Sequence, residues 1–218
     1  MSAAADRVGV TELYASIQGE STHMGRPCTF IRLAGCPLRC RWCDTEYSFD
    51  AGTRMAIPAV VEAVRALGLP LVEVTGGEPL SQQGARPLMH ALAEAGFEVL
   101  LETSGAVDMT QIDPRVTVIA DLKCPGSGEH GRNLWAQLAA LRPQDELKIV
   151  VADESDFTWA LGRLQHELVG ITAKVLWSAV HDELPAARLA ALLLDYRAPG
   201  RMQIQLHKVL WPDTDRGV

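Results

Sequence analysis

The sequence is poor in the features that tie proteins to nucleic acids or membranes. Its 218 residues hold 20 lysines and arginines against 27 aspartates and glutamates, a formal charge of -7. Broad binding to nucleic-acid phosphates needs a cationic surface, and no basic run appears. No apolar run is long enough to cross a bilayer, and the N-terminal residues lack the basic and then apolar pattern of a secretion signal. We therefore expect a cytoplasmic protein without a direct nucleic-acid or membrane partner.

Cysteine is scarce, and its placement is uneven. Cys36, Cys40 and Cys43 lie close together, whereas Cys28 and Cys124 stand apart from them. In a reducing compartment, clustered cysteines indicate metal ligands or reactive thiols more readily than disulfides, and an odd total of five points the same way.

Apolar periodicity alternates between strand-like and helix-like segments along the chain. We expect strands at 28–33, 71–75, 97–102, 116–122, 146–151, 174–177 and 202–206, and helices at 58–67, 86–95, 133–141, 154–168 and 184–196. This alternation favours a parallel sheet with crossover helices. Because the units are too few for a closed barrel, we expect one α/β domain over residues 1–218, built as a shortened, open (partial) TIM-like β/α barrel.

Unusual residues follow five of the expected strands. They are the cysteine loop, Thr75–Pro79, Glu102–Gly105, Lys123–Gly126 and His207–Lys208. The carboxyl ends of parallel strands meet at the edge where α/β proteins bind their ligands. We therefore expect these loops to converge on one site.

The cysteine loop, CPLRCRWC, has the spacing C-x3-C-x2-C. Structural zinc requires four ligands, and Cys28 is the candidate fourth, although it lies in an apolar strand where a free cysteine is usually a small buried hydrophobe. An iron-sulfur cluster held by three cysteines leaves one iron open to a substrate. The loop therefore predicts an open cluster, with a non-catalytic zinc or iron-sulfur sensor module as the alternative.

Segments spread over nearly the whole chain resemble one enzyme family. They are SIQGE (16–20), FIRLAGC (30–36), WCDTEYSF (42–49), TGGEP (75–79), ETSG (102–105), DLKCPGSGE (121–129), DELK (145–148) and QLHKVLW (205–211). The cysteine loop and TGGEP are similar to those of radical S-adenosylmethionine (SAM) enzymes, and the full set resembles the 7-carboxy-7-deazaguanine synthases. The resemblance implies a barrel of the radical SAM type. It also implies conversion of 6-carboxy-5,6,7,8-tetrahydropterin to 7-carboxy-7-deazaguanine with loss of ammonia, started by a 5'-deoxyadenosyl radical from SAM, in queuosine biosynthesis.

The same resemblance implies a [4Fe-4S] cluster, SAM and Mg2+ as cofactors, a small-molecule pterin substrate, an electron donor such as flavodoxin, and a homodimer. The implied metal ligands are Cys36, Cys40 and Cys43 for the cluster and Thr45 for Mg2+. SAM contacts are implied for Trp42, Cys43, Asp44, Gly76, Gly77, Glu78, Ser104, Asp121, Leu122 and Lys123. Pterin contacts are implied for Ile17, Gln18, Gly19, Glu20, Arg32, Thr75 and His207. Many relatives carry Ser-Pro-Lys where this chain has Asp121-Leu122-Lys123, which leaves the roles of the first two residues open.

The residue types suit these roles. Glu78 offers an anionic acceptor for an ammonium group, Gln18 a carboxamide for the ring edge, and Arg32 a cation for the substrate carboxylate. Later proton transfers have four candidates that the sequence does not separate: His207, Lys208, Glu20 and Glu102. No residue after Lys208 is assigned. A radical SAM activase acting on a protein partner is the remaining enzyme alternative.

Overall fold

Nine β-strands form one sheet in the computed structural model, which describes residues 5–50, 52–214 and 216–218. Their order is β3-β1-β2-β4-β5-β6-β7-β8-β9. The parallel strands are β2 (Pro27–Leu33), β4 (Leu71–Gly76), β5 (Glu98–Thr103), β6 (Thr117–Lys123), β7 (Glu146–Val151), β8 (Lys174–Ala179) and β9 (Arg201–Met202). Because β3 and β9 are not joined, the sheet is open, which confirms the predicted fold class.

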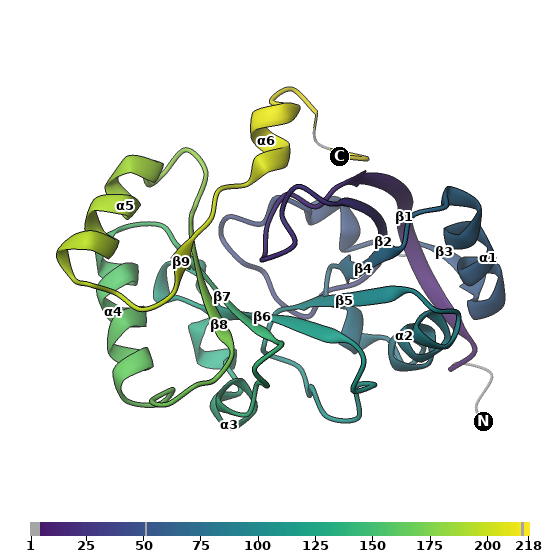
Figure 1. Cartoon of the computed structure of the whole chain (residues 1–218), viewed down its shortest axis with the longest axis horizontal. Coiled ribbons are helices and arrows are strands. Elements are labelled where there is room, and N and C mark those ends of the chain that lie inside the picture. The colour runs from purple at the N-terminus through teal and green to yellow at the C-terminus, as the bar shows by residue number, and fades with distance from the viewer. Residues whose placement is uncertain (1–4, 51, 215) are drawn as a thin grey trace.

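Six α-helices accompany the strands in the described residues. They are α1 (Ile57–Leu67), α2 (Ala85–Glu94), α3 (Trp135–Ala139), α4 (Glu154–Gln165), α5 (Ala186–Asp195) and α6 (Leu206–Leu210). Figure 1 shows α1 and α2 beside the β1–β5 half of the sheet and α4 and α5 beside the β7–β9 half. None of these helices has the length and apolar content needed to cross a membrane.

The alternation of side chains along each strand separates a core from a cavity. On β4, Val72 and Val74 belong to the main hydrophobic core, whereas Glu73 and Thr75 line the cavity. The same division holds on β7, where Leu147 and Ile149 enter the core and Lys148 faces the cavity. One face of the sheet is therefore apolar, and the other carries ionisable groups.

Two strands were not predicted from the sequence. β1 (Arg7–Ile17) pairs antiparallel with β2, and β3 (Thr53–Ala56) pairs antiparallel with β1. β1 runs through RVGVTELYASI, in which polar residues interrupt the apolar ones, so it lacks the run that marks the buried central strands. The β3-β1-β2 edge of the sheet is therefore antiparallel, not parallel.

The prediction of a strand at 202–206 is wrong for most of its length. β9 covers only Arg201–Met202, and the chain turns into α6 at Leu206. Ile204 is exposed, so the apolar alternation at 202–206 does not mark a strand with one buried face. His207 and Lys208 consequently lie on a short helix and not at the end of a strand.

The connection between β1 and β2, residues 18–26, is named the hairpin turn here. It is anchored to strands that are distant in sequence: the Thr22 amide donates to Glu146 at the start of β7 (3.2 Å), and Arg26 pairs with Glu98 at the start of β5 (2.5 Å). The Ser21 amide donates to Gln203 Oε1 just after β9 (2.7 Å). The hairpin turn therefore crosses the concave side of the open sheet near the amino ends of its strands, between its two halves (Figure 1).

Candidate active site

A cavity of about 790 Å3 lies between the hairpin turn, the loops that follow β2, β4 and β5, and the carboxyl end of β6. All of the predicted site residues except Glu78 and Leu122 line it. The predicted convergence of the strand-end loops is thus found in the structure. The group named the rim here consists of five of the lining residues on the loops after β2, β4 and β5: Cys36, Cys40, Cys43, Gly77 and Ser104.

The three clustered cysteines are free, partly exposed and open onto this cavity, whereas Cys28 and Cys124 are fully buried away from it. Burial raises the pKa of both isolated thiols, which keeps them protonated. Across residues 5–50, 52–214 and 216–218, no three His, Cys, Asp or Glu side chains converge closely enough for a single metal ion. Three thiols without a fourth therefore suit a multi-iron cluster with an open position better than zinc.

Glycine is required where the rim loops touch. A Cβ on Gly77 would collide with the carbonyl of Gly35 and come within 3.1 Å of Cys36 Cβ. The Glu78 amide donates to the Gly35 carbonyl (2.8 Å), so the TGGEP segment and the start of the cysteine loop are held together backbone to backbone. The glycines of TGGEP consequently set the position of the first cysteine.

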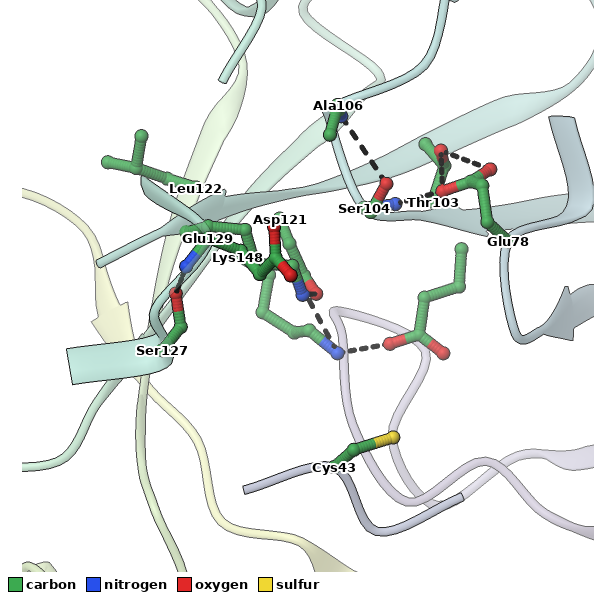
Figure 2. Close-up of polar contacts among 12 residues, drawn as sticks. Cys43, Glu78, Thr103, Ser104, Ala106, Asp121, Leu122, Ser127, Glu129 and Lys148 are labelled. Carbon is green, nitrogen blue, oxygen red and sulfur yellow. Dashed lines mark hydrogen bonds and ion pairs between the residues drawn. The ribbon is translucent and has the colours of Figure 1, made fainter. Parts of the chain in front are cut away.

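Glu78 does not occupy the expected position facing a ligand. Its carboxylate is fully buried and accepts hydrogen bonds from the amides of Leu80 (2.9 Å) and Ser104 (2.7 Å) and from Thr103 Oγ1 (2.9 Å). Figure 2 shows Glu78 directed at Thr103 and Ser104. The side chain therefore fixes the loop after β5 to the loop after β4, and its oxygens are already satisfied.

Leu122 also differs from the expectation. Its side chain is 1 % exposed and packs in the main core, because residues 121 and 123 of β6 face the cavity and the residue between them faces away. Lys123 Nζ bonds to Asp121 Oδ2 (2.5 Å), so these two residues form an ion pair on the cavity wall.

Lys148 joins several acids inside the cavity. Its ammonium bonds to Glu102 and Glu20 (3.0 Å to Oε2) and lies 3.5 Å from Asp121 Oδ1; Figure 2 shows Asp121 and Lys148 side by side. Burial works to lower the pKa of Lys148, but the carboxylates outweigh it and raise the pKa well above its usual value. Burial likewise opposes ionisation of Glu102, yet Lys148 dominates and lowers its pKa to about 2. All members of this cluster except Lys148 were weighed at the sequence level; a lysine inside the β-strand pattern ELKIVV was the available signal.

Arg32 lines the cavity from β2. Its Nε bonds to Glu12 Oε2 (3.0 Å), and its Nη2 donates to the hydroxyl of Tyr14 (3.2 Å). Tyr47 donates to the same Glu12 oxygen (2.8 Å) and places its ring 5.9 Å from the guanidinium. Arg32 is therefore held in one orientation by groups that leave part of its cationic fork facing the cavity.

Gln18 lies at the cavity, but its amide is engaged by the protein. Nε2 donates to Glu73 Oε2 (2.6 Å), and Oε1 accepts from the amide of Glu20. Glu73 was missed at the sequence level, where it is the one charged residue of the strand LVEVTG. Burial, and next the charge of Glu102, raise the pKa of Glu73 to about 8.

The start of α6 closes one side of the cavity. The Leu206 amide donates to the Gly19 carbonyl (2.9 Å), and a Cβ on Gly19 would collide with His207. Gln205 Nε2 donates to Glu20 Oε1 (2.9 Å) and lies 3.4 Å from Asp44 Oδ2. The C-terminal segment thereby links the hairpin turn to the cysteine loop. Figure 1 shows α6 at the top of the view, near the C-terminus.

Comparison with known proteins agrees with this geometry. Residues 30–124 match the model of the Radical SAM superfamily. A 7-carboxy-7-deazaguanine synthase from Chlorobaculum tepidum is 44% identical over 97% of this chain and 97% of its own length. One from Koribacter versatilis is 38% identical over 96% of this chain and 99% of its own.

Solved structures show the same fold. The crystal structure of QueE from Escherichia coli superimposes with a TM-score of 0.76 over 92% of this chain and 95% of that one, at 22% identity. The identity to the Chlorobaculum and Koribacter synthases extends over both chains almost completely. The chain belongs to the radical SAM superfamily and, within it, to the 7-carboxy-7-deazaguanine synthase family.

Proposed function

We propose that the cavity converts 6-carboxy-5,6,7,8-tetrahydropterin into 7-carboxy-7-deazaguanine with loss of ammonia, and that the whole chain acts as one radical SAM domain. The observation that carries this proposal is the opening of three free cysteines and a buried set of ionisable groups onto one cavity. The synthase relatives share this chain over nearly its full length. The activase alternative and the non-catalytic metal module have no comparable support.

Cys36, Cys40 and Cys43 would hold the [4Fe-4S] cluster, and SAM would lie against Trp42, Asp44 and the glycines of TGGEP. When bound, the cluster and SAM supply the one-electron chemistry that begins the reaction. The chain positions the reacting carbon and excludes water from it. Ser104, Asp121 and Lys123 line the same part of the cavity and would complete the SAM contacts. Leu122 can take part only through its main chain, because its side chain is in the core.

Arg32 would pair with the substrate carboxylate, because it is the cation that β2 directs into the cavity. Thr45 would ligate Mg2+ through its hydroxyl, which lies 3.8 Å from Cys43 Sγ. A hydroxyl is a weak ligand for a hard cation, so substrate oxygen and water would provide most of the coordination. Metal and substrate would therefore bind together.

The ion cluster around Lys148 bears on the later proton transfers. Because the pKa of Glu102 is lowered to about 2, this side chain is an ionised acceptor at neutral pH and does not donate a proton. Burial, the leading influence on His207, lowers its pKa despite the nearby carboxylates of Glu20 and Asp44. A neutral imidazole at the cavity can accept a proton, which makes His207 the better candidate for removing one from the substrate.

We further propose a cytoplasmic homodimer that takes its electron from a flavodoxin-like donor. These expectations come from the family resemblance. Size measurement in solution and electron transfer from purified flavodoxin would test them directly.

The decisive experiment is an anaerobic assay with reconstituted cluster, dithionite, SAM, Mg2+ and 6-carboxytetrahydropterin, followed by mass spectrometry. We expect 7-carboxy-7-deazaguanine from the unmodified chain and none from Cys40→Ala. Cys124→Ala is the matched control, since that thiol is buried away from the cavity. Formation of 5'-deoxyadenosine without the deazapurine would retain the radical SAM chemistry and reject the substrate.

A further inference from the structure

Glu73 differs from the other buried acids in the described part of the chain. The other four are Glu78, Asp145, Glu146 and Asp156. Each of those accepts at least one main-chain N–H and a further hydrogen bond, for example from the amides of Gly126 (2.8 Å) and Ala152 (3.2 Å) to Asp156. Glu73 is 2 % exposed and accepts one hydrogen bond, from the side chain of Gln18.

A buried carboxyl group with so few partners is costly. Transfer from water removes several hydrogen bonds, and a buried polar group normally regains them from the protein or from an ordered partner. The raised pKa of Glu73 reflects this shortage, because burial is its leading cause. Since Glu73 lines the cavity, a ligand there can supply the missing donors.

The surroundings of Glu73 define the shape of such a ligand. Phe30 is its neighbour in the β2–β4 register and lines the cavity, and Tyr14 stacks on Phe30 with ring centroids 5.3 Å apart. On the other side, β5 places Leu100 opposite Glu73. The carboxyl group therefore sits beside flat and apolar side chains, which suit the plane of a heterocycle.

The cation Arg32 lies on the same wall of the cavity as Glu73, further towards the rim. Arg32 follows Phe30 by two positions on β2 and pairs in register with Thr75, so it faces the cavity about 7 Å nearer to the rim. The cavity thus offers the carboxyl group of Glu73 and the guanidinium cation of Arg32, spaced along the strand direction. A flat bicyclic ring system with N–H donors at one end and a carboxylate at the other would complement both side chains.

We propose that Glu73 recognises the N–H donors of the 2-amino-4-oxopyrimidine ring of the substrate, with the exocyclic amine and the adjacent ring N–H directed at its carboxyl oxygens. This inference rests on the proposed function and adds a specificity residue to it. It also replaces the expectation that Gln18 contacts the ring edge through its amide, because both ends of that amide are bonded within the protein. Gln18 then acts as a positioning residue that holds one oxygen of Glu73.

The test compares two stable ligands that differ only at the recognised edge, pterin-6-carboxylate and lumazine-6-carboxylate, in which an oxo group replaces the 2-amino group. Affinities are measured by calorimetry on the reconstituted protein with SAM at pH 9, above the pKa of about 8 that burial gives Glu73, so that its carboxylate is ionised. We expect the unmodified chain to favour the pterin by roughly 10- to 100-fold, the range for a hydrogen bond to a charged group. Glu73→Leu should bring the ratio of the two affinities close to one, and Glu73→Gln should retain part of it.

Glu146→Gln is the control, because Glu146 is equally buried but lies outside the cavity lining. It should lower the unfolding temperature without changing the pterin-to-lumazine ratio. A ratio in Glu73→Leu and Glu73→Gln equal to that of the unmodified chain would overturn the role of Glu73 and leave the proposed function intact. Failure of the unmodified chain to bind or convert any pterin, with SAM binding preserved, would instead reject the proposed substrate.

Discussion

The cavity is built differently at its two ends. The rim comes from short contiguous segments, in which the cysteine spacing and the glycines of TGGEP already specify the contacts. The hairpin turn is held by pairs that are far apart in sequence: 55 residues separate Gln18 from Glu73, 124 separate Thr22 from Glu146, and 182 separate Ser21 from Gln203. The rim therefore carries the residues that indicate the type of chemistry, whereas the hairpin turn brings Gln18 and Glu20 to the ionisable groups on the cavity wall.

The largest expected effect comes from removing the residue that joins the two ends. Lys148→Met leaves Glu102, Glu20 and Asp121 without their shared cation inside the protein. Breaking a buried ion pair from one side typically costs about 3–5 kcal/mol, so we expect a loss of that order in the free energy of unfolding at pH 7. Urea denaturation measures it.

The pH dependence provides a check on this mechanism. The pKa of Glu102 is lowered to about 2 from its ordinary value of 4.5, so its ionised form stabilises the fold above pH 4.5 and this contribution is lost as the pH falls towards 2. The difference in the free energy of unfolding between the unmodified chain and Lys148→Met should therefore shrink between pH 5 and pH 3.

The matched control for Lys148→Met is Lys174→Met. It removes a half-exposed lysine 3.9 Å from Glu146 and should cost no more than about 1 kcal/mol. Equal losses for both variants would contradict the special role of Lys148.

A second effect concerns the rim alone. Gly77→Ala places a methyl group against the Gly35 carbonyl and Cys36, so it should displace the first cysteine. A shift of about 1 Å at a reacting centre can cost roughly 100-fold in rate, and we expect a loss of that order in turnover together with a lower iron content.

Gly162→Ala is the matched control for Gly77→Ala. It lies within α4 with nothing near the added Cβ, and it should stabilise the helix by about 0.5–1 kcal/mol without altering iron binding. Normal iron content and turnover in Gly77→Ala would show that the rim accommodates a methyl group at residue 77 without displacing Cys36. That result would contradict the role assigned to this glycine.

The same contrast explains which features were predictable from the sequence. The parallel strands and their loops follow from apolar runs and strand-end motifs, because each run is buried on both sides by helices and cavity-lining residues. β1 was missed because its pairing with β2 is antiparallel and its polar residues break the pattern. Glu78 was placed against a ligand because the motif shows an acid beside glycines, and only the structure shows Thr103 and Ser104 taking its oxygens.

A third, smaller effect isolates the hairpin turn. Thr22→Val removes the hydroxyl that donates to the fully buried Glu146. A hydrogen bond to a charged group contributes roughly 1.5–3 kcal/mol, so the free energy of unfolding measured in urea should fall by that amount. Thr158→Val is the comparison, because its hydroxyl bonds to the Glu154 carbonyl on an exposed helix surface. If the two valine variants are equally stable, the Thr22 hydroxyl does not anchor the turn to Glu146.

The smallest effect concerns Mg2+ at the junction of rim and substrate. Thr45 offers one neutral hydroxyl, so its removal in Thr45→Val should weaken Mg2+ binding by only about fivefold, or roughly 1 kcal/mol. The proposal that metal and substrate bind together makes a sharper prediction: in the unmodified chain, calorimetric titration of Mg2+ should show tighter binding with the pterin present than without it. Linkage requires the pterin to bind more tightly by the same factor when Mg2+ is present, and Thr45→Val should reduce that factor. Equal Mg2+ affinity with and without the pterin would mean that Thr45 does not bring the two together, and the metal would then have to be held by the protein alone.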